Sequence, residues 1–295
     1  MSFFRHTPYD GSSLPFAVGL KPIEEGSWLE PDFFLDGHLS EKERLIALDR
    51  ESVFRNEDDT AAAQEEVRDL IVGNLVRFHG NTHQFVTGSD QVVIGTRQVS
   101  LENLPALLAV SRIVQEDLVL MRHGPDGYRL VAASLCFPSS WSLSEKFGRS
   151  MAGIHETVPG FNGGRMGQMV ARLFENLKPD QLLCRFNWSF HPDGDLHHPY
   201  PKNMRFETPE SALARLYLRV ERQTLRRLPQ TGDILFTIKI HHDPLAALEH
   251  SEDRSRLAEG LKTQLLSLRR DQLAYKGLAE TREALVSALK RFESR

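Results

Sequence analysis

The stretch QLLCRFNWSF (181–190) decides the fold class, because its side chains alternate regularly in character. One set of alternate positions is apolar, and the set between them carries Arg185, Asn187 and Ser189. The same period of two recurs in ARLYLRVER (214–222) and in DILFTIKIH (233–241). Successive side chains of a strand point to opposite faces, so the three stretches predict an antiparallel sheet with one apolar and one polar face. That polar face could meet solvent, a polar helix or a partner chain.

The segments that precede these strands mix helical and extended patterns. An extended arm is expected over residues 14–34, attached to a surface by Phe16, Trp28 and Phe33. Ser40 and Glu43 have the spacing of a capping box for a helix over residues 40–50. Apolar residues at helical spacing predict further helices, and period-two runs predict further strands. The expected helices cover 61–78, 104–122 and 165–177; the expected strands are a hairpin within 83–95 and a strand over 128–137.

The chain therefore divides into three regions and belongs to the α+β class. Residues 1–78 form the arm and helices packed on the core, and residues 79–243 form the core itself. Residues 244–295 combine leucines at helical spacing with interleaved charges, which predicts solvated C-terminal helices.

Composition excludes several classes of protein. The 295 residues carry a net charge of −4, so no overall basic field favours nucleic acid. Two cysteines cannot build a disulfide framework. No apolar run approaches the roughly 20 residues of a membrane span, and the N-terminal residues lack the apolar core of a signal peptide. We therefore expect a cytoplasmic protein that binds neither membranes nor nucleic acid.

One histidine has the context of a metal ligand. In EKFGRSMAGIHETVPG (145–160), His155 stands just before Val158-Pro159-Gly160. A rigid turn fixes the direction of the backbone, which suits a ligand that must point one way. The alternative is a buried histidine that is satisfied by a backbone carbonyl.

Four motifs together resemble a known family: the segment around His155, FPSSW (137–141), RFNW (185–188) and ERQTLRRLP (221–229). They resemble the haem-binding alpha subunit of haem-dependent oxidative N-demethylases, formerly a family of unknown function. The resemblance runs from residue 14 to about residue 244. It implies a PAS-like core, in which a five-stranded antiparallel sheet curves around a small-molecule pocket, with helical N- and C-terminal extensions.

The resemblance also implies an activity. A monooxygenase-type oxidoreductase would use haem b and dioxygen to demethylate a small secondary amine such as dimethylamine, releasing formaldehyde. The sequence carries no flavin fingerprint and no iron–sulfur cysteine set. Electrons must then come from another chain, which matches the separate flavin and iron–sulfur reductase subunit of the family. A haem-binding sensor without turnover and a cofactor-free interaction protein are the alternatives.

On this resemblance, His155 is the expected proximal iron ligand. Arginine suits bidentate pairing with carboxylates, so the cluster in ERQTLRRLP is a candidate for binding the haem propionates, unless it forms internal ion pairs with Glu221. Other residues of the motifs are expected to shield or contact the cofactor. The expected propionate partners are Arg222, Arg226 and Arg227, and the other cofactor contacts are Trp141 and Arg185.

Two further residues are expected at the reacting groups. Asn187 would donate a hydrogen bond to dioxygen, and Glu221 would be the counter-ion of the protonated amine. Both assignments require the polar face of the sheet to line the pocket. The opposite picture, in which Cys184, Phe186 and Trp188 form an apolar wall, is left open by the alternation.

Overall fold

The computed structural model describes residues 3–12, 16, 18–201, 204 and 208–292. A seven-stranded sheet runs through it in the order β1-β8-β9-β10-β6-β7-β2, and each neighbouring pair is antiparallel. Its strands are β1 (Lys21–Pro22), β2 (Phe54–Asn56), β6 (Asp117–Gly124), β7 (Gly127–Ser134), β8 (Leu182–His191), β9 (Tyr217–Arg227) and β10 (Ile234–Pro244). A small second sheet contains β3 (Gln84–Phe85), β4 (Gln91–Ile94) and β5 (Arg97–Ser100). The α+β class is therefore confirmed.

The register of the central strands fixes what each face carries. Asn187 pairs with Glu221 and Glu221 with Ile240, so these three share one face, here called face A. Trp188, Val220 and His241 share the other, face B. The apolar set of β10 thus lies on the face opposite to the apolar sets of β8 and β9. The expectation of one apolar and one polar face across all three strands is wrong, because alternation within a strand does not determine how neighbouring strands align.

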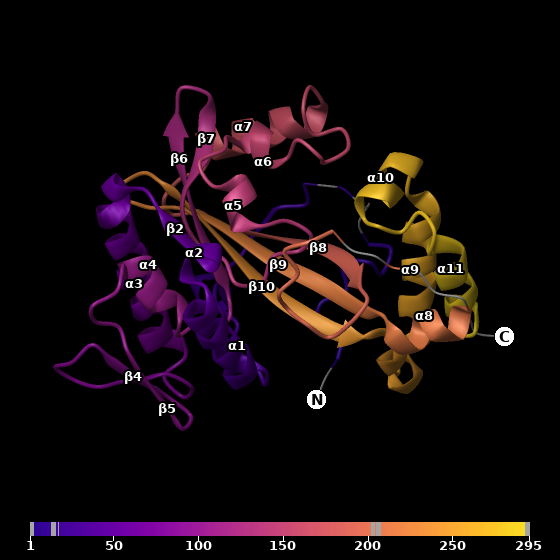
Figure 1. Ribbon diagram of the computed structural model, residues 1–295, viewed down its shortest axis with the longest axis horizontal. Helices are drawn as coiled ribbons and strands as arrows, with labels where there is room; N and C mark the ends of the chain where they lie inside the picture. The colour runs from indigo at the N-terminus through magenta and orange to yellow at the C-terminus, as the bar shows by residue number, and fades with distance from the viewer. Residues whose placement is uncertain (1–2, 13–15, 17, 202–203, 205–207, 293–295) are drawn as a thin grey trace.

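Three groups of helices cover the two faces (Figure 1). Apolar side chains of α5 (Leu143–Lys146) and α7 (Arg165–Asn176) join a core built on face A, and α6 (Met151–Ile154) packs beside it. On face B, α1 (Leu35–Leu48), α3 (Ala61–Phe78) and α4 (Ala106–Ser111) cover one end. The other end contacts α8 (Pro209–Arg215), α9 (Arg254–Ser267), α10 (Arg270–Tyr275) and α11 (Arg282–Lys290). In Figure 1 the N-terminal and C-terminal groups lie at opposite ends of the sheet.

Four short elements complete the chain: α2 (Arg50–Val53) and the 3₁₀ helices η1 (Glu25–Ser27), η2 (Asp58–Thr60) and η3 (Leu245–His250). The core under the N-terminal helices joins Leu39 and Val67 to Leu120 and Leu235 of the sheet. Helices α1 and α3 therefore share one hydrophobic core with the sheet.

One predicted helix is wrong. The helix expected over 104–122 ends at Ser111, and β6 begins at Asp117. Leu118 and Leu120 pack on one side of β6, whereas Val119 and Met121 pack on the other. A strand buried on both faces is a continuous apolar run, and periodicity alone cannot separate such a run from a helix.

Two smaller expectations about the N-terminal region also differ from the structure. Helix α1 begins at Leu35, so Ser40 lies inside it, where its Oγ donates to the carbonyl oxygen of Asp36 instead of capping the helix. Phe33 is 75% exposed and does not anchor the arm, whereas Trp28 is fully buried. The Trp28 indole donates to Thr224 Oγ1 of β9 at 3.2 Å, so this side chain holds the arm on face B.

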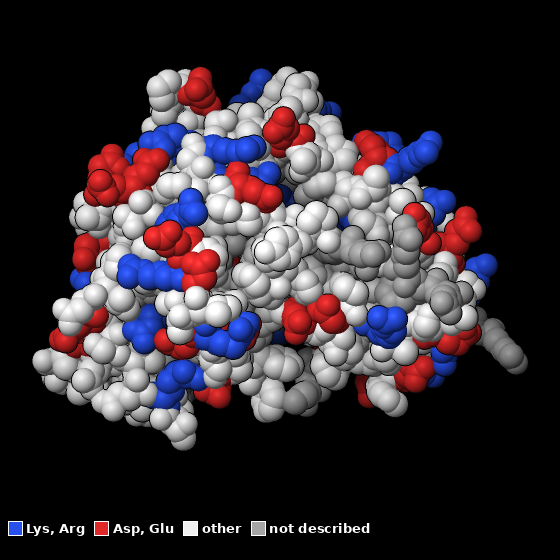
Figure 2. Space-filling view, viewed as in Figure 1, with Lys and Arg blue, Asp and Glu red and all other residues white. Residues whose placement is uncertain are grey.

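Acidic and basic side chains are interspersed over the surface seen in Figure 2. Within the described residues, no helix combines the length and the apolar character that crossing a membrane requires.

Candidate functional site

His155 lies at the C-terminal end of α6 and is held from several sides. Ser150 caps the helix by accepting a hydrogen bond from the Gly153 amide at 3.3 Å. The His155 ring stacks on Phe161 with a centroid separation of 4.2 Å and an interplanar angle of 11°. The turn that follows is closed by the Val158 amide, which donates to the His155 carbonyl oxygen at 3.0 Å. The local sequence therefore fixes the direction of this imidazole, as the Pro-Gly turn predicts.

The hydrogen bond of His155 decides which ring nitrogen is available. Nδ1 lies 2.9 Å from the carbonyl oxygen of Met151, an acceptor, so Nδ1 carries the proton in the neutral ring. Burial lowers the pKa of His155, and the positive charges of Arg185 and Lys146 lower it further, while the bond to Met151 opposes them. The neutral ring then presents the Nε2 lone pair, which is the form that ligates metals.

The core on face A is bordered by apolar side chains that are only partly buried. Met151 and Ile154 come from α6, which ends at His155, whereas Leu183 comes from β8 and Phe236 from β10. Partly accessible apolar side chains gathered around polar groups are typical of a ligand site. Trp141 belongs to the same partly buried set, and its role in shielding a cofactor edge stays a prediction.

A row of polar side chains crosses face A beside this apolar group. Arg185 pairs with Gln223, and Asn187 pairs with Glu221 in the next position. Asn187 Nδ2 donates to Glu221 Oε2 at 3.3 Å, and Gln223 Nε2 donates to the same oxygen at 2.9 Å. Arg219 Nε lies 3.4 Å from Glu221 Oε1. The structure therefore brings Arg185, Asn187 and Glu221 onto the face that α6 covers.

Two residues of the C-terminal region, which the sequence analysis does not predict, interact electrostatically with Glu221. Burial of the phenol group raises the pKa of Tyr275, although the residue as a whole is 48% exposed, and the charge of Glu221 raises it further. Burial lowers the pKa of Lys276 to about 8, although the charge of Glu221 opposes the shift. Lys276 also donates to the Trp188 carbonyl oxygen. No local motif signals these residues, because only the tertiary packing of the C-terminal region brings their charges within range of Glu221.

Arg222 and Arg226 lie away from His155, on face B. Arg222 donates to the carbonyl oxygens of Ser27 and Trp28, the latter at 2.8 Å, and lies 3.2 Å from Glu30. Arg226 pairs with Glu25 at 2.9 Å and stacks over the Trp28 ring at 4.4 Å. Both guanidinium groups hold the N-terminal arm on the sheet. The structure does not bring them together with His155, and their pairing with propionates stays a prediction.

Arg227 lies on face A but joins elements of the scaffold. It donates to the carbonyl oxygens of Leu177 at 2.6 Å and Gly232 at 2.7 Å, and to the Tyr128 hydroxyl at 2.8 Å. These bonds attach the end of α7 to the turn between β9 and β10.

The alternative apolar wall is covered by other parts of the chain. The Trp188 indole donates to Gln264 Oε1 of α9 at 2.8 Å, and the Phe186 ring lies 4.7 Å from the His6 ring. Cys184 is buried beside β1. The arm and the C-terminal helices therefore lie over this wall.

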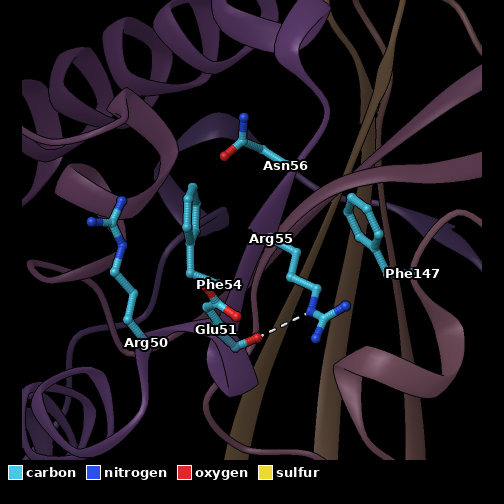
Figure 3. Close-up of a pocket in the computed structure, with 6 residues that line it drawn as sticks. All are labelled: Arg50, Glu51, Phe54, Arg55, Asn56 and Phe147. Carbon is cyan, nitrogen blue, oxygen red and sulfur yellow. Dashed lines mark hydrogen bonds between the residues drawn. The ribbon is translucent and has the colours of Figure 1, made fainter.

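A hollow of about 460 Å³ lies elsewhere, at the edge of the sheet (Figure 3). Its lining is mostly polar or charged, and Arg55 Nε donates to the Glu51 carbonyl oxygen at 3.1 Å within it. It shares only Phe147 with the partly buried apolar set on face A. We therefore place the functional site at His155 on the basis of its donor chemistry, not at this hollow.

Comparison with known protein families identifies the family of the chain. The model of one family, described as haem-dependent oxidative N-demethylase, alpha subunit-like, matches residues 19–286. The match includes His155, the polar row on face A and the C-terminal residues Tyr275 and Lys276. The chain therefore belongs to the haem-dependent oxidative N-demethylase alpha subunit-like family.

Proposed function

We propose that this chain is the haem-binding, catalytic subunit of an oxidative N-demethylase that acts on a small secondary amine. The observation that carries the proposal is His155, a neutral imidazole whose Nδ1 bonds Met151 and whose Nε2 is therefore a potential ligand. It lies on the face of the sheet that also carries the acid–amide pair Glu221 and Asn187.

The residues on face A fit haem b. His155 offers the ligand, and the partly buried side chains of Trp141, Met151 and Ile154 offer apolar contact for a macrocycle. Arg185 acts on His155 through its positive charge, which makes it our first candidate for a propionate partner. When bound, haem would supply the activation of dioxygen, and the protein would supply binding, orientation and exclusion of water.

The overall reaction determines which groups the polar side chains on face A must bind. One dioxygen, two electrons and two protons convert an N-methyl group to formaldehyde, with the shorter amine and water as the other products. A secondary amine is protonated at neutral pH and needs a counter-ion or an aromatic face. Glu221 offers a carboxylate and Tyr275 a phenol ring, and Asn187 and Gln223 orient the carboxylate.

The electrons would come from a separate flavin and iron–sulfur reductase subunit. The alpha subunit-like description of the family supports a partner chain of some kind. A PAS-like fold is part of the proposal: strands β6 to β10 form five adjacent antiparallel strands, and α5–α7 connect β7 to β8 over face A. We also propose a cytoplasmic location.

Spectra and turnover test the proposal together. The purified protein should bind haem stoichiometrically and show a Soret band that shifts with dithionite. With a matched reductase, NAD(P)H and dimethylamine, it should consume dioxygen and release formaldehyde. Dioxygen consumption without amine is the control reaction. A protein that stays colourless with added hemin would overturn haem binding altogether.

A haem sensor without turnover is the second candidate, and one observation favours it. Glu221 already accepts hydrogen bonds from Asn187 and Gln223 and contacts Arg219, so its charge is partly satisfied within the protein. A normal Soret band with dioxygen consumption that ignores every small amine would select the sensor.

A further inference from the structure

We propose a second metal site, of the zinc class, on face B, where the N-terminal arm crosses the sheet. Its ligands are His6 and Glu30 of the arm and His241 of β10. The site lies on the face opposite to Asn187 and Glu221, so it is separate from the proposed haem site. Nothing in the oxidative N-demethylase activity requires it.

The three donor groups already converge. One potential ligand atom from each residue lies within 4.8 Å of the other two. Glu30 Oε2 lies 2.9 Å from His6 Nε2 and 3.6 Å from His241 Nε2. In a tetrahedral zinc site with bonds of about 2.0–2.1 Å, ligand atoms lie roughly 3.3 Å apart. Shifts of less than about an ångström would bring these two contacts to that separation, and the ligand atoms of His6 and His241 lie within 4.8 Å of each other.

His241 gives independent evidence for a ligand. Its side chain is only 7% exposed, yet its buried Nε2 has no hydrogen-bond partner within the described residues. The nearest carboxylate oxygen, at 3.6 Å, is beyond hydrogen-bond distance. A buried polar atom without a partner is costly. Nε2 faces Glu30 and the His6 ring, whose centroid lies 4.7 Å from that of His241, so an ion at this point would satisfy it.

Arg222 orients the Glu30 carboxylate toward the two histidines. Its Oε1 lies 3.2 Å from Arg222 Nε, whereas its Oε2 faces the two histidines. A carboxylate held through one oxygen presents the other in a fixed direction, as the outer partners of metal ligands commonly do. Arg222 also places a positive charge close to the ion, which lowers its affinity below that of an unpaired carboxylate site.

Metal binding changes the position of the proton on His6. Without an ion, the contact between His6 Nε2 and Glu30 Oε2 at 2.9 Å requires an N–H at Nε2 of His6. Zinc replaces this proton at Nε2, and the neutral ring then carries its proton on Nδ1. Two histidines and one carboxylate leave a fourth position for water, the ligand set found in several zinc sites.

Metal binding would hold the N-terminal arm against the sheet. His6 and Glu30 are far from His241 in sequence but lie on the same face, and an ion that joins them attaches His6 and Glu30 to β10. An ion that binds only the folded arrangement stabilises it by mass action. Two imidazoles and a carboxylate suit a divalent cation of intermediate softness such as Zn²⁺, which is the ion to test. Mg²⁺, a hard cation that prefers oxygen ligands, is the control.

The experiment uses the full-length, tag-free holo-protein, with titration calorimetry for Zn²⁺ and thermal unfolding with and without it. We expect one Zn²⁺ bound per chain, a raised melting temperature, and no such response to Mg²⁺. Glu30→Gln and His6→Ala should each weaken binding at least tenfold and remove the thermal response. His241→Gln is the third variant, since it keeps a polar group in the buried position. His250→Ala removes an exposed histidine outside the cluster and should bind zinc as the parent does.

Three outcomes would overturn the site: no zinc binding by the parent, equal responses to Zn²⁺ and Mg²⁺, or unchanged binding in all three ligand variants. Haem content, read from the Soret band of the same samples, separates this test from the proposed function. If zinc does not bind but the Soret band is intact, only the proposed zinc site on face B is contradicted. If haem does not bind but zinc does, only the proposed haem site on face A is contradicted.

Discussion

Asn187 on β8 donates a hydrogen bond of 3.3 Å to Glu221 on the neighbouring strand β9. The two residues are direct partners in the register, so their side chains leave the sheet on the same face. Ile240, the next partner across, places an apolar side chain beside the carboxylate. A charged group oriented by an amide and bordered by apolar surface is suited to bind a small cation.

Glu221→Gln tests this role. Removing the charge should lower kcat/KM for the amine by about tenfold to a hundredfold, since a hydrogen bond to a charged group contributes about 1.5–3 kcal/mol. The Soret band should stay unchanged, because the side chain of Glu221 is not an expected ligand. Steady-state formaldehyde release at several amine concentrations measures the effect.

The control for Glu221→Gln separates binding from folding. Glu221 contacts the fully buried Arg219, so the substitution also costs some stability. Glu259→Gln, which removes an exposed carboxylate paired with Lys262, should change neither rate nor melting temperature. An unchanged kcat/KM in Glu221→Gln, at a melting temperature close to that of the parent, would rule out the counter-ion role.

Arginine variants distinguish the two faces of the sheet. Arg185→Ala should weaken haem retention, because Arg185 lies on face A near His155. Arg226→Ala should leave the Soret band intact and lower the melting temperature, because it removes the pairing with Glu25 and the stacking on Trp28. Haem content per chain and the melting temperature, measured for both variants, test these two expectations. If Arg226→Ala loses haem while Arg185→Ala keeps it, the propionate partners lie in the ERQTLRRLP motif.

Stability should fall on acidification. Burial lowers the pKa of His38 to about 4, and its Nδ1 lies 3.1 Å from the Gln115 side-chain amide, which acts as the donor. The unfolded chain, with a histidine pKa near 6.5, then binds more protons than the folded chain between about pH 6.5 and 4. Stability therefore falls as pH decreases through that window, by at most about 3 kcal/mol from this residue.

His38→Gln checks this pH dependence. Glutamine can accept the bond from Gln115 without titrating, so the fall in melting temperature between pH 7 and pH 4.5 should be smaller than in the parent. Asp243 acts in the opposite sense, because burial raises its pKa to about 6, but it is present in both proteins and cancels in the comparison. Equal pH profiles for the two proteins would exclude His38 as a source of acid sensitivity.

The individual strands were predictable from the sequence, but their alignment was not. Alternation identifies β8, β9 and β10, and it assigns Asn187 and Glu221 to the polar set of each strand. It cannot show that Ile240 shares their face, because register depends on the turns and on the packing of both faces. The mixed character of face A, polar on β8 and β9 and apolar on β10, appears only when the strands are aligned.

The site was predictable only where its signal is local. His155 stands beside a Pro-Gly turn in sequence, so its fixed direction could be expected. Tyr275 and Lys276 reach Glu221 through tertiary packing of the C-terminal region, which leaves no trace in their own segment. The arginine-rich motif predicts an anion site, and its local sequence does not show that Arg222 and Arg226 also contact the N-terminal arm.

His155→Ala is the decisive test of the haem site. Its ring stacks on Phe161 at the end of a short helix, outside the main sheet, so its loss should leave the far-UV CD spectrum close to that of the parent. Haem should be lost or bound at least tenfold more weakly, and added imidazole should partly restore the Soret band by replacing the missing ligand. His197→Ala is the matched control, since His197 Nδ1 also bonds a carbonyl oxygen, that of Cys136, at 2.7 Å. Full haem with an unshifted spectrum in His155→Ala, and its loss in His197→Ala, would move the iron ligand to the loop that follows β8.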